Sequence, residues 1–440
     1  MCQYIEGEEG GHMSAISEIL KDVKLPQMVR VHQQFDQSRV EDVPGEVRKQ
    51  LAREEIAQTI RPGMRIAITC GSRGLDNLKE IIRTIVEVCK QHGAEPFIIP
   101  AMGSHGGATA QGQREICESF GVTEAYCGCP LRATMEVTQI GQTPEGHPVL
   151  IDRYAAEADG IIVLNRVKRH TAFDGPYQSG IMKMMTIGLG KQVGASVCHR
   201  RGYSQMAHLI PLFGNAILAH ANVLFAVALI ENAYDQTCRI AALTREEIPQ
   251  EEPKLLEEAK ARMARLLPGS ADALIIDWSG KNISGGGIDA NITGRSTSKY
   301  FGKPNFDAGK VAVLNLTDES HGNMHGIGNA DVICRRVFEK GDLEKTYPNS
   351  MTSTTLKADA LPVMMKNDLE TVKCALLTCN CEDPDRPRVI RIRDTLHISE
   401  ILVSACMVEE VSRIPGMQII GEPEDWHFDR EGNIDFDCWQ

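Results

Sequence analysis

Short apolar runs alternate with segments of helical spacing through the first half of the chain. Met64–Cys70, Pro96–Pro100 and Gly160–Asn165 are apolar runs of strand length, and each leads into a polar loop. Leu75–Gln91 and Ala110–Phe120 instead place apolar residues every three or four positions, which is typical of an amphipathic helix. Strand and helix patterns in this order predict a mostly parallel sheet that is covered by helices.

The second half of the chain repeats this order. Asn222–Ile230 and Thr237–Leu243 are two further strand-like runs. The charged segment Glu251–Leu267 has the spacing of an amphipathic helix and is a candidate connection between domains. After it, Ala271–Asp277 and Val311–Leu316 are again apolar runs that lead into Gly-rich or polar loops. We therefore expect an α/β protein.

These patterns divide the 440-residue chain into two expected α/β domains with mostly parallel sheets covered by helices. Residues 1–245 are expected to form a cofactor-binding domain, and residues 246–395 a second domain that closes over the substrate. The segment 396–440 is expected to complete the first domain, with a helix from Ile398 and a polar end. The active site should lie in the cleft between the two domains.

Composition narrows the class of protein. No run approaches the roughly 18 apolar residues of a membrane-spanning helix, and the acidic N-terminus lacks the apolar core of a signal peptide. The net charge of −12 argues against a nucleic-acid-binding protein, because no basic tract offsets repulsion from phosphate. The 14 cysteines show no regular spacing, which favours free thiols in the cytoplasm over a disulfide framework.

Basic side chains follow three of the expected strands. Arg73 lies in the loop GSRG, His105 in GSHGG and His170 in VKRHTAFDG. The carboxyl ends of parallel strands meet at one edge of a sheet, so these loops can converge on one crevice. There an arginine can bind a carboxylate through two hydrogen bonds, and a histidine can move a proton near neutral pH. A surface arginine and ordinary turn histidines are the structural alternatives.

Lys183 and His199 lie 16 residues apart in SGIMKMMTIGLGKQVGASVCH. A lysine in this apolar setting loses hydration, which favours its neutral, nucleophilic amine. A lysine with a buried stem and an exposed ammonium is the alternative. His199 is a candidate metal ligand, or else a structural histidine. Because the chain has no HExxH or paired-cysteine motif, a metal at His199 needs ligands from outside the protein.

Two polar loops of the second half are further candidates. Gly285–Gly287 and the residues after them can present backbone N–H groups to a phosphate or carboxylate, although their spacing matches no established phosphate motif. His321 and His325 are four residues apart, but the glycines around them disfavour the helix that a zinc pair on one face would need. Neither loop identifies a ligand by itself.

Four elements occur in the order Arg73 loop, His105 loop, Lys183 and His199. This order resembles the nickel-pincer-nucleotide-dependent lactate racemase family, and GKNISGGGIDANITGR is similar to a motif common in its broader membership. The resemblance implies a nickel-pincer nucleotide, pyridinium-3-thioamide-5-thiocarboxylic acid mononucleotide, as the cofactor. Lys183 would carry this cofactor through a thioamide, and His199 would bind its nickel.

The resemblance also implies the reaction. The pyridinium ring takes a hydride from C2 of a 2-hydroxy acid while a histidine, His105 or His170, removes the hydroxyl proton. The 2-keto acid then turns over and takes the hydride back on its other face, which inverts C2. The implied partners are this small-molecule substrate and the enzymes that make and load the cofactor. The further contacts that we expect are those of the cofactor with Ser72, Gly188 and Lys191, and those of the substrate with Arg73, Lys168, Arg295 and Lys299.

Two positions depart from the family. The residue ten positions before Lys183, a second catalytic histidine in lactate racemases, is Phe173, and His170 is its expected replacement. The acidic residue expected three positions before Arg73 is Cys70. These changes favour a larger 2-hydroxy acid, such as a sugar acid, with racemisation or epimerisation at C2. The alternatives are a cofactor-dependent oxidoreductase of the same fold that does not invert C2, and a nickel- or cofactor-binding protein without turnover.

Overall fold

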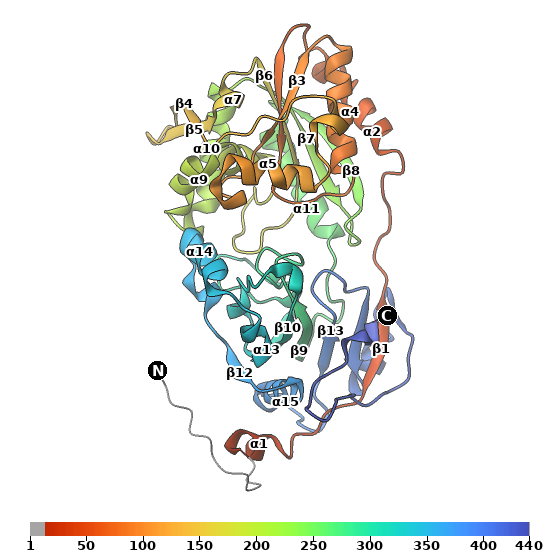
Figure 1. Ribbon diagram of the computed structural model, residues 1–440. Coiled ribbons are helices and arrows are strands. Elements are labelled where there is room, and N and C mark those ends of the chain that lie inside the picture. Colours follow the sequence, from red (N-terminus) through yellow and green to blue (C-terminus); the bar gives the residue numbers. More distant parts are fainter. Residues whose placement is uncertain (1–13, 440) are drawn as a thin grey trace.

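The computed structural model describes residues 14–439, which form two bodies, each built on one large sheet (Figure 1). The strands of the first body are β2 (Arg65–Cys70), β3 (Glu95–Pro100), β6 (Gly160–Arg166), β7 (Val223–Glu231) and β8 (Thr237–Thr244). They lie in the order β3-β2-β6-β7-β8. The first four in this order are parallel, and only β8 pairs in the antiparallel direction. The mostly parallel sheet expected from the sequence is confirmed.

Alternate residues of these strands pack against helices on opposite faces of the sheet. Ile66 and Ile68 of β2 join one apolar cluster with α2 (Val43–Leu51) and α4 (Leu78–Gln91), whereas Ala67 joins another with α10 (Met206–His220) and α11 (Ile248–Arg262). The sheet is therefore covered on both faces. The other elements of this body away from the site are α3 (Glu54–Ala57), α5 (Ala110–Ser119), α6 (Glu124–Cys127), α7 (Arg153–Ala156) and the hairpin of β4 (Val137–Gln142) and β5 (Pro148–Asp152).

The second body is built on an eight-stranded sheet. Its parallel half consists of β12 (Val363–Met365), β11 (Val332–Cys334), β10 (Asp307–Leu316), β9 (Ser270–Ser279) and β13 (Val389–Ile392), in that order. The strands β9 and β10 are the two runs predicted from the sequence. The helices of this body are α1 (Ala15–Leu20), α12 (Ala290–Thr293), α13 (Arg335–Glu339), α14 (Leu343–Ser353), α15 (Asp368–Thr378) and α16 (Val408–Val411).

The antiparallel half of this sheet corrects the expected domain division. β14 (Glu400–Ser404), β1 (Met28–Gln33) and β15 (Met417–Ile419) continue the sheet beyond β13 in antiparallel pairs. The described part of the segment 396–440 therefore completes the second body and not the first. The first strand of the chain joins it as well, so that β1 lies among strands from the other end of the sequence in Figure 1.

The helix expected from Ile398 is also corrected, because β14 is a strand. Its residues Ile401 and Val403 are buried in the core of the second body, while Glu400 and Leu402 between them are half-buried. This alternation has the period of a strand, and it is short enough to be overlooked beside the apolar residues that follow it. Val403 lies opposite both Val29 of β1 and Ile390 of β13.

The chain crosses between the two bodies twice. Residues 34–42 lead from β1 into α2, and α11, the charged helix predicted from the sequence, leads back toward β9. Arg262 at the end of α11 donates to Asp36 (Nη1 to Oδ2, 3.1 Å) and to Ser38 (Nη1 to Oγ, 3.1 Å) on the other crossing. The two connections are thus tied to each other.

Two chemical properties of residues 14–439 bear on the sequence analysis. No helix in this range has the length and the apolar character that crossing a membrane requires. Every cysteine in the same range is a free thiol, and most of these thiols are buried.

The carboxyl group of Glu252 is buried at the start of the segment that carries Lys183. Its Oε2 accepts a 2.8 Å hydrogen bond from the backbone N–H of Met182 in α8 (Ile181–Lys183). Its side chain also fills the space that a Cβ atom on Gly180 would occupy. Desolvation raises the pKa of Glu252 to about 8, although the backbone hydrogen bonds act in the opposite direction. The group is therefore largely protonated near neutral pH.

Replacing Glu252 with Gln should remove a pH dependence of stability. The pKa of Glu252 is about 8 in the folded protein against an ordinary value of 4.5, so between these values the folded state holds the extra proton. The free energy of unfolding of the wild type therefore falls as the pH rises through this window. The thermal midpoint of Glu252→Gln, measured across this pH window, should therefore rise relative to that of the wild type as the pH increases. The neighbouring variant Glu251→Gln, on the same helix, should follow the wild type; parallel curves for Glu252→Gln would contradict the expectation.

Candidate active site

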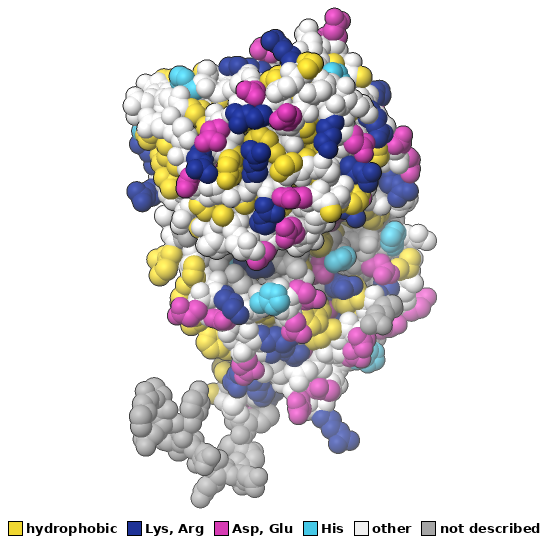
Figure 2. Space-filling model, turned by 45° about the horizontal axis from the view of Figure 1, so that its top comes forward, with side chains coloured by type: hydrophobic (Ala, Val, Ile, Leu, Met, Phe, Trp, Pro, Cys, Tyr) yellow, Lys and Arg dark blue, Asp and Glu magenta, His cyan; other side chains and the backbone are white. Residues whose placement is uncertain are grey.

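Loops that follow parallel strands of both bodies meet at the gap between them, which Figure 2 shows as a hollow with histidine side chains beside it. Arg73, in the loop after β2, is exposed there, and a Cβ atom on Gly285 of the second body would lie 2.7 Å from its Nη2 atom. Desolvation by the surrounding protein, followed by repulsion from Arg166, lowers the pKa of Arg73. No carboxylate within residues 14–439 pairs with it, so its guanidinium is available to an anionic ligand.

The loop after β3 brings His105 to the same gap. Its Nδ1 lies 2.8 Å from the carbonyl oxygen of Met102, which assigns the proton to Nδ1 and leaves Nε2 as an acceptor. Desolvation is the main cause that lowers the pKa of His105, and Arg73 and Lys183 lower it further against the effect of the Met102 hydrogen bond. His105 is therefore neutral near neutral pH and can accept a proton.

Lys183 ends α8 and is followed by a turn of π-helix, η2 (Met184–Leu189). Such turns are rare and occur frequently at functional sites. Desolvation, then repulsion from Arg73, lowers the pKa of Lys183 to about 8, and no carboxylate in the described part of the chain offsets this. The ring of Phe173 lies beside it, with its centroid 5.9 Å from Nζ. A substantial fraction of the amine is therefore neutral and nucleophilic at mildly alkaline pH.

His199 closes α9 (Lys191–His199), near Lys183 and His105. Desolvation, then the charges of these two neighbours, lowers its pKa to about 4, so that the imidazole is neutral and able to bind a metal ion. Among residues 14–439, no group of three or more His, Cys, Asp or Glu side chains is arranged to hold a metal. A metal at His199 would therefore take its other ligands from a bound molecule.

His170 reaches the site, but its ring is held on two sides. Desolvation, with smaller effects from Lys183 and His199, lowers its pKa well below the ordinary value, which places it beside them. Its Nδ1 accepts a 3.1 Å hydrogen bond from the backbone N–H of Ala172, and its ring packs on Phe173 with the centroids 4.2 Å apart. The proton therefore resides on Nε2, which can donate a hydrogen bond but cannot take a proton.

The predicted contact of Lys191 with the cofactor is wrong. The side chain of Lys191 has no exposed surface, and its ammonium forms an ion pair with Asp152 (2.9 Å) and donates to Gln113 (3.1 Å). Gln113 in turn donates to the carbonyl oxygens of Gly103 (2.9 Å) and His105 (3.2 Å). Lys191 is therefore a positioning residue beneath the His105 loop.

Gly188 packs against the chain that leads into the His105 loop. It lies in η2, where its carbonyl oxygen accepts a 3.2 Å hydrogen bond from the N–H of Gly103, and a Cβ atom on it would lie 2.5 Å from the carbonyl oxygen of Ala101. A side chain here would push the His105 loop away from the segment that carries Lys183. The predicted contact of Ser72 with the cofactor stays a prediction; Ser72 is half-buried in the loop after β2.

The second body adds a lysine that the sequence reasoning missed. Lys281 follows β9, and its Nζ donates a 2.6 Å hydrogen bond to the carbonyl oxygen of Gly285. Desolvation, then repulsion from Arg73, lowers its pKa to about 8, with Asp359 acting in the opposite direction. Lys281 and Arg73 therefore approach each other from different bodies. The signal was present in the sequence, because Lys281 lies in the same Gly-rich segment as Gly285–Gly287, whose backbone N–H groups can face an anion.

Two of the predicted substrate contacts lie in the second body. The guanidinium of Arg295 donates to the carbonyl oxygen of Ala308 (2.6 Å) and pairs with Asp331 (3.2 Å), and its contact with a substrate stays a prediction. Lys299 is exposed, with its Nζ 5.2 Å from the ring centroid of Tyr300. Its contact with a substrate stays a prediction.

The loop after β6 joins the two bodies. Arg169 donates a 2.6 Å hydrogen bond to the carbonyl oxygen of Lys303 and lies over the ring of Phe301, 4.8 Å from its centroid. Its neighbour Lys168 acts electrostatically on Asp235, at the turn between β7 and β8. The predicted contact of Lys168 with a substrate stays a prediction, while Arg169 is committed to the interface.

Fold and site together define a two-body α/β protein whose cleft gathers neutral histidines and cations without carboxylate partners. Residues 15–208 match the family model of the lactate racemase N-terminal domain, a range that contains Arg73, His105, Lys183 and His199. This match over the N-terminal part of the chain confirms that the sequence is similar to the lactate racemase family there. The lactate racemase apoprotein from Thermoanaerobacterium thermosaccharolyticum is a similar solved structure, with 13% identity, 78% of this chain and 88% of that chain covered, and a TM-score of 0.44. No curated protein matches the sequence.

Lys183, at the end of α8, and Lys191, at the start of α9, should respond differently to replacement by Met. Lys191→Met leaves the carboxylate of Asp152 buried without a counter-charge, which should cost about 3–5 kcal/mol in the free energy of unfolding. Lys183→Met removes a desolvated cation that has no carboxylate partner and should leave stability unchanged or raised. Denaturant unfolding of both variants, with Lys191→Met/Asp152→Asn as the partial rescue, measures the difference. Equal losses for the two variants would contradict these roles.

Proposed function

We propose that this protein is a racemase or epimerase that inverts C2 of a 2-hydroxy acid with a nickel-pincer nucleotide as cofactor. The observation that carries the proposal is Lys183, a lysine without a carboxylate partner and with a pKa of about 8, beside the neutral imidazole of His199. Covalent attachment through a lysine needs a neutral amine, and binding of a metal through a histidine needs a neutral ring. This pair of side chains offers both in one cleft.

The donor set supports a cofactor of this kind. His199 offers one nitrogen ligand, and the described part of the chain has no cluster that could complete a metal site. The remaining donors would therefore come from the cofactor, whose sulfur and carbon atoms suit nickel. When bound, it supplies a pyridinium ring that accepts a hydride and returns it. The protein's contribution is to hold the ring at Lys183 and the metal at His199.

Arg73 and Lys281 are suited to bind the carboxylate of the substrate. They come from different bodies, and their mutual repulsion contributes to the lowered pKa of Lys281. A carboxylate between them would offset this repulsion, and the planar guanidinium can bind it through two hydrogen bonds. Substrate binding would thereby draw the two bodies together and exclude water from the cleft.

His105 is suited to take the proton of the substrate's hydroxyl group. Its Nδ1–H is held by Met102, so Nε2 is the acceptor. Desolvation, with a smaller effect of the surrounding cations, lowers the pKa of the ring and keeps it neutral before the substrate arrives. Removal of the hydroxyl proton strengthens the tendency of C2 to release a hydride, and return of the proton completes the product.

The proposed substrate is a larger polar 2-hydroxy acid, such as a sugar acid. Cys70 is fully buried against Cys117, so the position of the family's acidic residue contributes no charge to the cleft. Phe173 replaces a polar ring beside Lys183. The contacts on both sides of the lysine thus differ from those expected for lactate. The enzymes that synthesise and load the cofactor are the proposed partners.

Mass spectrometry of protein co-produced with the cofactor-making enzymes tests the proposal directly. We expect a mass adduct that maps to Lys183 and roughly one nickel per chain, because one lysine and one histidine hold one cofactor. Lys183→Ala should lose the adduct, His199→Ala should lose nickel and keep the adduct, and Lys299→Ala, with an exposed lysine replaced, should match the wild type. An unmodified Lys183 in the presence of competent maturation enzymes would sink the covalent link.

Arg73→Ala should weaken substrate binding by the loaded protein. Hydrogen bonds to charged groups contribute about 1.5–3 kcal/mol, so KM for the 2-hydroxy acid found by screening should rise about 10- to 100-fold. The rise should also appear for Lys281→Met, since both cations face the same gap. Initial rates of inversion, followed by chiral chromatography, give KM and kcat. An unchanged KM in both variants would remove the carboxylate site from this part of the cleft.

A further inference from the structure

Apart from His199, the proposed metal ligand, the described residues of the first body supply one histidine that can take a proton at the cleft. His105 keeps Nε2 as an acceptor, whereas His170 carries its proton on Nε2. Phe173 stands where the family has its second catalytic histidine, and a phenyl ring cannot move a proton. Inversion at C2 needs a proton acceptor and donor for the hydroxyl oxygen on each side of the substrate. The second group has to come from another part of the cleft.

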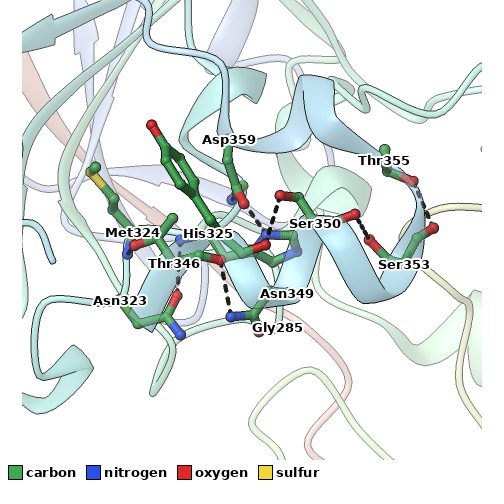
Figure 3. A network of polar contacts seen from close by, with 12 residues as sticks. Gly285, Asn323, Met324, His325, Thr346, Asn349, Ser350, Ser353, Thr355 and Asp359 are labelled. Atoms are coloured by element: carbon green, nitrogen blue, oxygen red, sulfur yellow. Dashed lines mark hydrogen bonds and ion pairs between the residues drawn. The ribbon is translucent and has the colours of Figure 1, made fainter. Parts of the chain in front are cut away.

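The second body contains a histidine that is held by a buried carboxylate. Nδ1 of His325 lies 2.7 Å from Oδ1 of Asp359 (Figure 3). The same oxygen also accepts a 3.2 Å hydrogen bond from the N–H of Gly326. The side chain of Asp359 is 2% exposed and that of His325 is 15% exposed. This contact assigns the proton of His325 to Nδ1 and leaves Nε2 as an acceptor, the same arrangement as at His105.

Asp359 is ionised in this arrangement. Burial alone would raise its pKa, but the hydrogen bond from His325 and the contacts with Ser350 and Gly326 lower the pKa below its ordinary value. A carboxylate that accepts from Nδ1–H fixes the tautomer and the orientation of the ring and stabilises the imidazolium that forms when Nε2 takes a proton. His325 is thus prepared for proton transfer.

The Gly285–Gly287 loop packs against the backbone of the segment that carries His325. A Cβ atom on Gly287 would lie 3.0 Å from the carbonyl oxygen of His325, and one on Gly326 would overlap the backbone of the loop. At its other end the same loop approaches Arg73 of the first body, as described above. Glycine is required for this approach, so the loops that carry His325 and Arg73 lie against the same three residues.

We propose that His325 is the second acid/base group of the cleft and that Asp359 is its positioning residue. This inference rests on the proposed function. With the oxygen of a 2-hydroxy acid toward one of the two histidines, His105 or His325, the O–H bond would break and the proton would move to Nε2 of that ring. After the keto acid turns over, the other histidine, protonated from solvent, would give a proton to the oxygen, and the first would release its proton to solvent. A cofactor held at Lys183 and His199 would supply the acceptor and donor of the C2 hydride.

Because the two bodies face each other, groups from each body can reach opposite sides of a substrate in the cleft, as inversion at C2 requires. His105 belongs to the first body and His325 to the second, so each can serve the oxygen in one of its two orientations. Asp359 also acts electrostatically on Lys281, which places the pair beside the proposed carboxylate site. The histidine lost at Phe173 is thereby replaced from across the cleft.

The kinetic test compares two histidines of one loop in the loaded protein. His325→Asn should lower kcat for inversion by about 100-fold or more, with KM changed much less, because it removes a proton acceptor. His321→Asn, which replaces the exposed histidine four residues earlier, is the matched control and should retain wild-type rates. His325→Gln serves as the second substitution if the first lowers the thermal midpoint. Wild-type kcat in a folded His325 variant would overturn the inference.

The unloaded protein gives a readout that does not depend on activity. Nitrogen-15 spectra of labelled histidine, with the His325 signals assigned by their loss in His325→Asn, should show the neutral ring of His325 as the tautomer with the proton on Nδ1. Oxalate, a planar dicarboxylate used here as the probe, should shift the Nε2 signal. Asp359→Asn, whose amide can donate as well as accept, should change the tautomer while circular dichroism stays that of the wild type. A His325 signal unmoved by saturating oxalate would place the ring outside the site.

These results separate the inference from the proposed function. If Lys183 carries no adduct and no 2-hydroxy acid is inverted, the proposed function fails, and with it the reaction assigned to His325. If Lys183 carries the adduct and the wild type inverts its substrate while His325→Asn does so equally fast, the function stands and the role of His325 is refuted. Loss of inversion together with an oxalate-dependent shift of the His325 signal supports both.

Discussion

The direction of the parallel strands is the constraint on which the rest of the structure depends. In the first body β2, β3 and β6 all end at the gap between the bodies, and in the second body β9 and β10 do so from the other side. Arg73 and Lys281, far apart in the sequence, approach each other because each follows a strand of this kind. The two crossings of the chain, tied by Arg262, keep the two edges facing each other.

This arrangement leaves positive charge in the cleft without carboxylate partners for Arg73 and Lys183. The chain as a whole has a net charge of −12, yet in the cleft Arg73, Lys183 and Lys281 all have a lowered pKa, with desolvation as the first cause. A field of one sign in a cleft attracts ligands of the opposite sign and repels cations. Because these cations are desolvated and have no carboxylate partners, they destabilise the folded state until an anion binds. The buried Lys191–Asp152 pair and the protonated Glu252 lie under two of the loops concerned.

Most of the fold could be predicted from the sequence, because the buried strands are long apolar runs with turn residues at their ends. β14 could not, since five residues with two buried positions give a weak signal, and its membership of the second body depends on pairing with β1 from the opposite end of the chain. In the site, too, the residue types could be recognised from the sequence, whereas their roles depend on contacts with distant residues. Lys183 and Lys191 both lie in glycine-rich apolar sequence, and only the position of Asp152, given by the β4–β5 hairpin, decides that Lys191 is structural. Lys281 and His325 were underestimated because the partner that orients each of them is supplied by tertiary contact.

Cys70 stands where the resemblance to the lactate racemase family implies an acidic residue, so this position adds no charge to the cleft. A carboxylate three residues before Arg73 could pair with the guanidinium, whereas Cys70 is buried against Cys117 and leaves Arg73 without a protein counter-ion. The charge that the chain no longer supplies has to come from bound molecules, and each anion that binds offsets the repulsion felt by the next cation. Under the proposed function, cofactor and substrate would both stabilise this cleft, because a ligand that binds only the folded state favours that state by mass action. The charge balance around Arg73 would then depend on anionic ligands, since no protein carboxylate in the described residues pairs with it.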